Sequence, residues 1–264
     1  MRLLRFAPVV AILLVGCIEP LKPSRERTGF ISATTVALGA GPSYGLTFVG
    51  AFYRWDDLEL QFQALESCAG FFYSPTPPPL ATFPTLDAGA RLITQVSGRQ
   101  DTLFKSTELA IETYHLTSVN SVPHTPGDTL TLTIPGTVTG FPPQTVRVRT
   151  SEPFVLGPVN PSAPGDPITL TWTPAPAPGS TMLVSLRYNS VGTTDVPDTE
   201  LRCAFADDGS GTVIPSFAGA WSAAAAASRS VIAQRVRYTR VEMDALTKVI
   251  LLSFFDWPTP TGTP

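Results

Sequence analysis

The chain has 264 residues, a formal net charge of −3 and only 15% charged residues. Because this composition lacks the basic clustering that nucleic-acid binding requires, we expect no nucleic-acid partner. The 27 prolines, 20 glycines and 43% hydrophobic residues favour many short strands joined by tight turns around a real core. The same composition argues against long helices and against a disordered stalk.

The first sixteen residues have the pattern of an export signal. Arg2 and Arg5 precede an apolar run over residues 6–16. That run is long enough for a signal peptide but shorter than the ~20 residues that span a bilayer. The letters LVGC follow and end at Cys17, and they resemble the lipobox of bacterial lipoprotein precursors.

This resemblance implies cleavage before Cys17, a diacylglycerol on its sulfur and an acyl chain such as palmitate on the new amino group. Since each buried methylene contributes about 0.8 kcal/mol, two or three chains give nearly permanent anchoring in membrane lipid. Ile18 resembles the class sorted to the outer membrane of Gram-negative cells. We therefore expect a lipid-anchored envelope protein. The alternatives are an ordinary signal peptide with a chance cysteine and a short membrane anchor.

The next two segments are predicted to be a tether and a first domain. Residues 17–29 are polar and proline-containing, as expected of a short acylated tether. Within residues 30–152, runs such as FISATTVAL, LTFVGAFYR, LELQFQAL, ARLITQVS, LAIETYHL, TLTLTIPG and TVRVRTS alternate or are rich in β-branched and aromatic residues. Seven or more short strands at this spacing predict a β-sandwich.

A second β-sandwich is predicted over residues 153–257, followed by a disordered tail at 258–264. The run ITLTWTPAPAPGSTMLVSLRY resembles the start of a fibronectin type III domain, which implies that Trp172 packs in a core. Asp208-Gly209 predicts a hairpin turn, since type I′ turns need positive φ. The alanine-rich run SFAGAWSAAAAAS predicts one short helix. The fold class expected is all-β, with two tandem immunoglobulin-like or fibronectin type III-like domains.

Two cysteines remain after the anchor, Cys68 and Cys203. An exported protein meets an oxidising compartment, where a disulfide between them is allowed if their Cα atoms come within about 7 Å. The two residues fall in different expected domains, and each lies in a strand-like run. A disulfide and two buried thiols therefore both remain open.

No set of residues makes a convincing catalytic or metal site. The run GPSYG at 41–45 matches G-x-S-x-G, but strand-like sequence follows where a nucleophile elbow needs a helix. His115 and His124 lack zinc spacing, and the DDGSG turn at 207–211 lacks the spacing of a calcium loop. We expect no cofactor, no metal and no enzymatic activity.

Acidic and aromatic residues form clusters in the first expected domain. Asp56, Asp57 and Glu59 are expected to mark a turn and an exposed strand face. The aromatic clusters at 52–55 and 71–73 could bind sugar or protein, but alternation places about half of each in a core. The function expected is a non-catalytic binding or scaffold module with a protein or glycan ligand. The alternatives are an envelope hydrolase or carbohydrate-active enzyme, and a structural subunit of a surface assembly.

Overall fold

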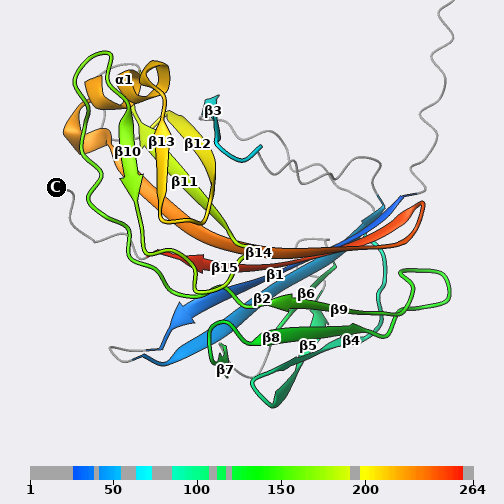
Figure 1. The fold of residues 1–264 in the computed structure, drawn as a ribbon. Coiled ribbons are helices and arrows are strands. Elements are labelled where there is room, and N and C mark those ends of the chain that lie inside the picture. The colour runs from blue at the N-terminus through cyan, green and yellow to red at the C-terminus, as the bar shows by residue number, and fades with distance from the viewer. Residues whose placement is uncertain are drawn as a thin grey trace, which may run out of the picture.

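Figure 1 shows the computed structural model, which describes residues 26–38, 42–54, 64–72, 85–106, 112–116, 121–190 and 197–257. Several predictions lie outside these residues: Cys17, the export signal, most of the tether, most of the strand-like run LELQFQAL, and the tail. In the part of the chain that is described, no helix is both long enough and apolar enough to cross a membrane.

The described elements are mostly strands, as the composition predicted. The strands are β1 (Arg27–Ala37), β2 (Tyr44–Arg54), β3 (Ser67–Phe72), β4 (Arg91–Val96), β5 (Arg99–Ser106), β6 (Thr113–His115), β7 (Val122–His124), β8 (Thr129–Ile134), β9 (Gln144–Arg149), β10 (Ile168–Thr171), β11 (Thr181–Tyr188), β12 (Thr199–Ala206), β13 (Ser210–Val213), β14 (Ser230–Asp244) and β15 (Thr247–Asp256). The helix expected in the second half is present as α1 (Pro215–Ala223), and a short 3₁₀ turn follows at Ala226–Ser228.

Among the described residues, thirteen strands form one large mixed sheet. Its order is β3-β12-β11-β14-β15-β1-β2-β6-β5-β4-β8-β9, with β7 also paired to β2. The pair β1–β15 is parallel and joins the strands of the first half to those of the second. A separate two-stranded sheet consists of β10 and β13. The strands of the two expected domains therefore share a single sheet.

The interior contains two large hydrophobic cores, each inside one lobe of the molecule (Figure 1). The first lobe packs residues of β1, β2, β4–β9 and the adjoining parts of β14 and β15, with Phe52, Tyr114 and Phe141 at its centre. The second lobe packs β10–β13 and α1, with Trp172 against Phe205. Trp172 is thus in a core, where the fibronectin type III resemblance placed it.

The two longest strands line both cores. β14 has 15 residues and is roughly 50 Å long at 3.3 Å per residue. Its inward-facing Ala233 belongs to the second core, whereas Val241 packs against the first. β15 does the same, with Phe255 in the second core and Leu251 in the first. Because side chains alternate along the strand with a period of two, one long strand can place side chains in both hydrophobic cores.

Polar contacts fill the junction between the two cores. The Ser151 backbone N–H donates to Ser253 Oγ at 2.9 Å, and Ser151 Oγ donates to the Ser253 carbonyl at 2.7 Å. Arg237 binds the Glu152 carboxylate through Nε at 2.9 Å and Nη2 at 3.1 Å. These buried groups all have partners, which limits the cost of removing them from water.

The prediction of a hairpin at Asp208-Gly209 is wrong. Gly209 does have the positive φ that was expected, +109°. The strands on its two sides do not pair, however, because β12 lies in the large sheet and β13 pairs with β10. The turn instead carries the chain from one sheet to the other, so that the second core lies between them.

Candidate functional site

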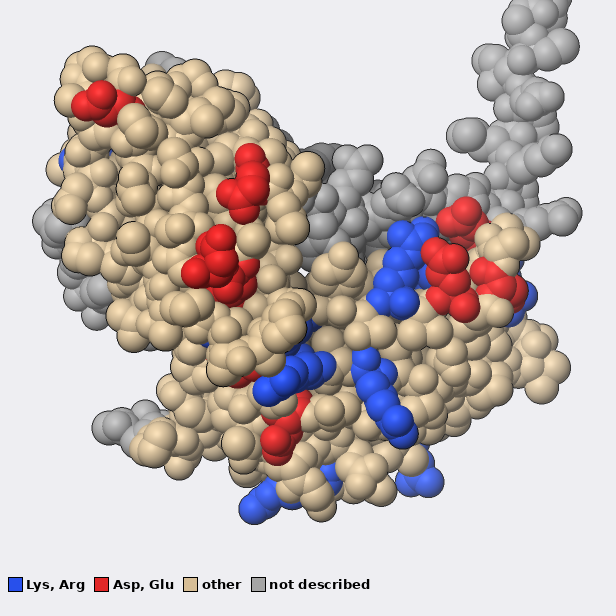
Figure 2. Space-filling view, viewed as in Figure 1, with Lys and Arg blue, Asp and Glu red and all other residues tan. Residues whose placement is uncertain are grey.

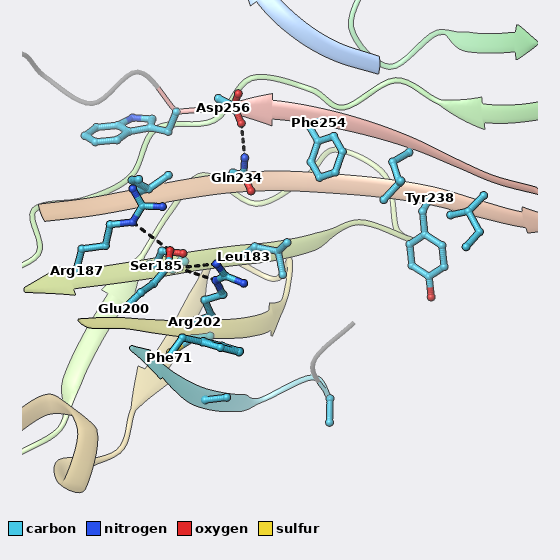
Figure 3. Close-up of a pocket in the computed structure, with 18 of the residues that line it drawn as sticks. Phe71, Leu183, Ser185, Arg187, Glu200, Arg202, Gln234, Tyr238, Phe254 and Asp256 are labelled. Atoms are coloured by element: carbon cyan, nitrogen blue, oxygen red, sulfur yellow. Dashed lines mark hydrogen bonds and ion pairs between the residues drawn. The ribbon is translucent and has the colours of Figure 1, made fainter. Parts of the chain in front are cut away.

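The candidate site is a groove on the outer face of the large sheet, opposite the cores. Side chains of β14 alternate between the two faces of the sheet. Near the second core the odd-numbered residues face that core, and the even-numbered residues, among them Gln234 and Tyr238, face the groove. The groove has a volume of about 1200 Å³ and is shown in Figure 3. We call it the outer-face groove. Its lining comes from β1, β3, β11, β12, β14 and β15 and includes Phe30, Phe71, Leu183, Ser185, Arg187, Glu200, Arg202, Gln234, Tyr238, Arg240, Ile250, Leu252, Phe254 and Asp256.

One end of the outer-face groove has an apolar floor, and an ion pair between Arg240 and Glu242 at 2.7 Å lies beside it. Tyr238 on β14 lies opposite Leu252 on β15, and Arg240 lies opposite Ile250. Ile250 and Leu252 form a buried floor, against which Phe30 of β1 packs. Tyr238 is 47% exposed. This end therefore combines a rigid apolar floor with an accessible aromatic side chain.

The other end is charged. Glu200 on β12 is 1% exposed, and its carboxylate accepts hydrogen bonds from Arg187 Nε at 3.1 Å and Arg202 Nε at 2.8 Å. The Arg202 guanidinium carbon also lies 4.6 Å from the centroid of the Phe71 ring. A cation stacked on an aromatic face and paired with a carboxylate is held in a defined orientation.

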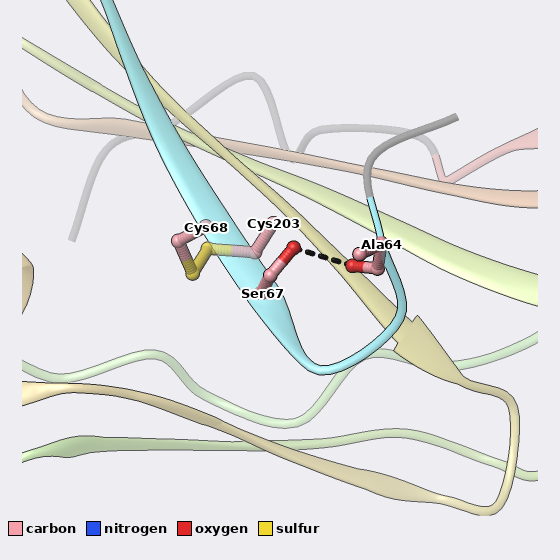
Figure 4. The surroundings of a disulfide bond; sticks show 4 residues. All are labelled: Ala64, Ser67, Cys68 and Cys203. Carbon is pink, nitrogen blue, oxygen red and sulfur yellow. Dashed lines mark hydrogen bonds between the residues drawn. A yellow bond between two sulfur atoms is a disulfide. The ribbon is translucent and has the colours of Figure 1, made fainter. Parts of the chain in front are cut away.

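The wall of the groove beside this charged end is β3, an edge strand of the described sheet. Cys68 on β3 lies directly opposite Cys203 on β12, and a disulfide joins them, with Cα atoms 4.1 Å apart (Figure 4). Of the two alternatives open from the sequence, the structure thus has the bridge. Ser67 Oγ donates to the Ala64 carbonyl at the start of this wall.

The residues weighed as catalytic or metal candidates do not come together. Ser43 is exposed and directly precedes β2, so a strand follows it rather than a helix. His115 lies in β6 and His124 in β7. No group of three or more potential metal ligands occurs among the described residues. Asp56, Asp57 and Glu59 lie outside them.

Asp207, from the acidic turn weighed as a calcium ligand, has a structural role. Its carboxylate accepts hydrogen bonds from Trp172 Nε1 at 2.9 Å and from Ser180 Oγ at 2.6 Å. It also forms an ion pair with Arg235. These donors occupy both carboxylate oxygens, so Asp207 stabilises the fold of the second lobe.

Burial perturbs two titratable groups in the first lobe. Removal from water lowers the pKa of His124 to about 4, with partial compensation by the nearby Asp128 charge. Its Nε2 lies 3.4 Å from Thr35 Oγ1, and its Nδ1 has no hydrogen-bond partner. Burial likewise raises the pKa of Tyr114, whose hydroxyl donates to the Gly89 carbonyl at 2.8 Å. Neither group lines the outer-face groove.

Sequence reasoning missed the groove residues on β11 and β12. A usable signal was present, because LVSLRY and TELRCAF alternate apolar residues with Arg187, Glu200 and Arg202. Alternation identifies a polar face, but it does not show that two such faces adjoin.

Figure 2 shows one side of the molecular surface. Most of the surface in view is formed by uncharged residues, and charged side chains cover a small part of it.

Comparisons with known proteins give no family. No protein-family model matches the sequence, and no curated protein matches it either. Among solved structures, the chain is similar to the yeast delta-COP-I mu-homology domain complexed with the Dsl1 WxWxV peptide, at 11% identity over 88% of this chain and 96% of that one, with a TM-score of 0.27. A second structure, described as the yeast delta-COP-I mu-homology domain, gives 9% identity, equal coverage and a TM-score of 0.26. Likeness at this level supports no conclusion about fold or function.

Proposed function

We propose that this chain is an envelope lipoprotein, anchored through acylated Cys17, that acts as a non-catalytic binding module. The binding surface in this proposal is the outer-face groove. The binding proposal is supported by the composition of the groove. It has an apolar floor at one end and an ordered charged cluster at the other, both on a rigid sheet. A preformed concave site with a few placed polar groups is the usual form of a ligand site.

The groove's chemistry favours recognition over catalysis. Among the described lining residues, the two carboxylates are already engaged, Glu200 by two arginines and Asp256 by Gln234 at 2.6 Å. Cys203 is in the disulfide, and no histidine lines the groove. A binding module needs groups held in place, whereas a catalyst needs an activated nucleophile or base.

The finer description of the fold is part of the proposal. We propose that residues 30–152 and 153–257 are two β-sandwich units of immunoglobulin-like or fibronectin type III-like type that share their longest strands. The two cores support this division, since the first draws chiefly on residues before 152 and the second on residues after it. The outer-membrane location in a Gram-negative cell rests on Ile18 after the lipobox.

Photo-crosslinking tests the binding surface. The full-length chain would carry p-benzoylphenylalanine at position 238 and be irradiated in its own envelope. The control carries the same group at position 138, where Val138 is 104% exposed in the loop between β8 and β9. We expect a discrete crosslinked species from position 238 and none from position 138. Equal or absent crosslinking at the two positions would overturn the binding proposal.

Mass spectrometry of the mature N-terminus tests the anchor separately. We expect Cys17 as the first residue, carrying a diacylglycerol and an amide-linked acyl chain. An intact Met1, or an unmodified Cys17, would contradict the lipid anchor and leave the groove proposal standing.

A further inference from the structure

We infer that residues 64–72, which include β3, form a redox-sensitive latch between the two lobes. Reduction of the disulfide between Cys68 and Cys203 releases β3 from β12, while both hydrophobic cores stay folded. This inference concerns the attachment of β3, so it holds whether or not the outer-face groove binds a ligand. Its grounds are the route of the chain, the small burial of β3 and the accessibility of Cys68.

The route of the chain places β3 on an excursion from the first lobe to the second. Tyr53, near the end of β2, forms an isolated bridge with Thr85. Next to it, the Leu86 N–H donates to the Phe52 carbonyl at 2.8 Å. The chain therefore leaves the first lobe and returns to it at the same place. Between these points β3 pairs with β12 of the second lobe (Figure 1), so the first lobe is closed without β3.

The packing of β3 holds it only weakly on the sheet. None of its six residues is buried, and the last three are exposed. Phe72 alone is 82% exposed. Six of the eight residues of β12 are buried, and among the described strands β3 pairs with β12 alone. Because apolar burial is the main stabilising term in folding, a strand that buries so little depends on its covalent link.

The non-covalent contacts beside the disulfide lie at the surface. The Glu66 carboxylate accepts a hydrogen bond from the Ala206 N–H at 2.9 Å, and both residues are solvent-accessible. The Phe71 ring, which is 42% exposed, lies 4.6 Å from the Arg202 guanidinium carbon. Glu66 also has a φ of +58°, in the left-handed region that residues other than glycine rarely adopt. Release of β3 therefore breaks surface contacts and relieves an unfavourable backbone conformation.

The disulfide is open to reduction from the Cys68 side. Cys203 is 1% exposed and packs in the second core, whereas Cys68 is half-buried at the margin of that core. A thiolate of a dithiol reductant attacks the Cys68 sulfur, the S–S bond breaks, and the Cys203 sulfur leaves and takes up a proton. The second thiol of the reductant then attacks the mixed disulfide, and Cys68 leaves as a thiol. The protein gains two electrons and two protons, and the dithiol becomes a disulfide.

Release of β3 changes two surfaces of the protein. The outer-face groove loses the wall residues Ala64, Ala69 and Phe71. β12 becomes an edge strand, and its unpaired N–H and C=O groups are then open to pairing with another strand. The redox state of one disulfide thus sets the shape of the groove and the exposure of the β12 edge.

The experiment uses the full-length protein in detergent at neutral pH, without denaturant. One sample is oxidised, one is treated with dithiothreitol, and one is reoxidised after the dithiothreitol has been removed. Alkylation mapped by mass spectrometry at Cys68 and Cys203 reports the state of the disulfide, and hydrogen exchange reports the protection of each strand. The paired substitution Cys68→Ser and Cys203→Ser represents the reduced state. Phe71→Ala is the matched control, since it removes a side-chain contact of β3 and keeps the disulfide.

We expect dithiothreitol to reduce the disulfide in the folded protein. The β3 amides should then exchange within about tenfold of the rate of an unstructured peptide, while β11 and β14 amides stay protected. Reoxidation should restore protection, the paired serine variant should match the reduced protein, and oxidised Phe71→Ala should keep β3 protected. Because the reductant acts on the wild-type protein, the test does not depend on folding of the serine variant.

Several results would overturn the inference. A disulfide that is reduced only in denaturant would identify a purely structural bridge. Continued protection of β3 after reduction would show that strand pairing holds it, and loss of protection in β11 and β14 together with β3 would show unfolding of the second lobe. Loss of β3 protection in oxidised Phe71→Ala would assign the attachment to side-chain contacts. Crosslinking at position 238 tests the proposed function separately, and neither result decides the other.

Discussion

Arg235 and Asp207 form an ion pair that is buried on both sides. Arg235 Nε lies 2.6 Å from Asp207 Oδ2, Nη2 lies 3.1 Å from Oδ1, and the two side chains are 0% and 2% exposed. The remaining Arg235 donors bind the backbone carbonyls of Glu152, Pro153 and Thr173. One guanidinium thus ties the end of the first lobe to two segments of the second.

Removing Asp207 should therefore destabilise the protein strongly. Asp207→Ala leaves a buried guanidinium without its counter-charge, which costs about 3–5 kcal/mol in the free energy of unfolding. Asp208→Ala is the matched control, because Asp208 is exposed and accepts one hydrogen bond from Ser210. We expect it to cost less than about 1 kcal/mol. Urea denaturation followed by tryptophan fluorescence measures both, and equal losses would show that the buried pair contributes little.

The disulfide should stabilise the wall of the groove. It links residues 135 positions apart in the sequence, so its loss frees a long loop in the unfolded chain. We expect the paired substitution Cys68→Ser and Cys203→Ser to lower the free energy of unfolding by about 2–5 kcal/mol. Hydrogen exchange of β3 amides should accelerate more than that of β14 amides. Unchanged protection of β3 would indicate that strand pairing alone holds this edge.

Stability should fall on mild acidification because of His124. Its folded-state pKa of about 4 lies below the ordinary value of 6.5, so the unfolded chain binds the proton first. The contribution of His124 to the free energy of unfolding is then greatest above pH 6.5, decreases as pH falls from 6.5 to about 4, and levels off below. We expect a loss on the order of 2 kcal/mol, since solvent screens part of the effect.

Substitution of His124 isolates that contribution. His124→Phe removes the titrating group, so the variant should lose the part of the pH dependence between 6.5 and 4. Chemical denaturation at half-unit pH steps gives the two curves. Parallel curves for the two proteins over this interval would assign the acid sensitivity to other groups.

Two glycines should differ sharply in their tolerance of a side chain. A Cβ at Gly140 would lie 2.0 Å from the Asp87 carbonyl oxygen, a backbone atom that cannot move aside. Gly140→Ala should therefore cost about 1–3 kcal/mol, as overpacking does. A Cβ at Gly70 on β3 would meet nothing within 4 Å, and Gly70→Ala should be neutral or slightly stabilising. Thermal unfolding of the two variants compares them directly, and a similar melting temperature for both would contradict the packing at Gly140.

Local patterns predicted the elements well and their partners poorly. Alternation and β-branched content located β12, β14 and β15, and alanine content located α1. The pairing of β1 with β15 depends on residues more than 200 positions apart, which no local pattern encodes. β5 was missed because RQDTLFKS carries three charged residues and little alternation.

The burial of two arginines on β14 could not be predicted from the sequence for a related reason. Arg235 and Arg237 alternate with Val236 and Tyr238 on β14, a pattern typical of a solvent-facing side. Both are buried because Asp207 and Glu152, from distant segments, supply counter-charges at short range. The outer-face groove was unpredictable on the same ground, since its lining comes from six strands that are dispersed along the sequence.

Cysteine accessibility in the native envelope tests the binding proposal most directly. Ser185→Cys places a thiol in the groove with little change of volume, and Val138→Cys places one on the exposed loop of the first lobe. Maleimide labelling rates are measured for both in intact envelopes and in the purified protein. The proposal predicts that the thiol at position 185 is at least tenfold slower in the envelope than after purification, while the thiol at position 138 is equally fast in both. Equal rates at position 185 in the two preparations would contradict a partner in the groove.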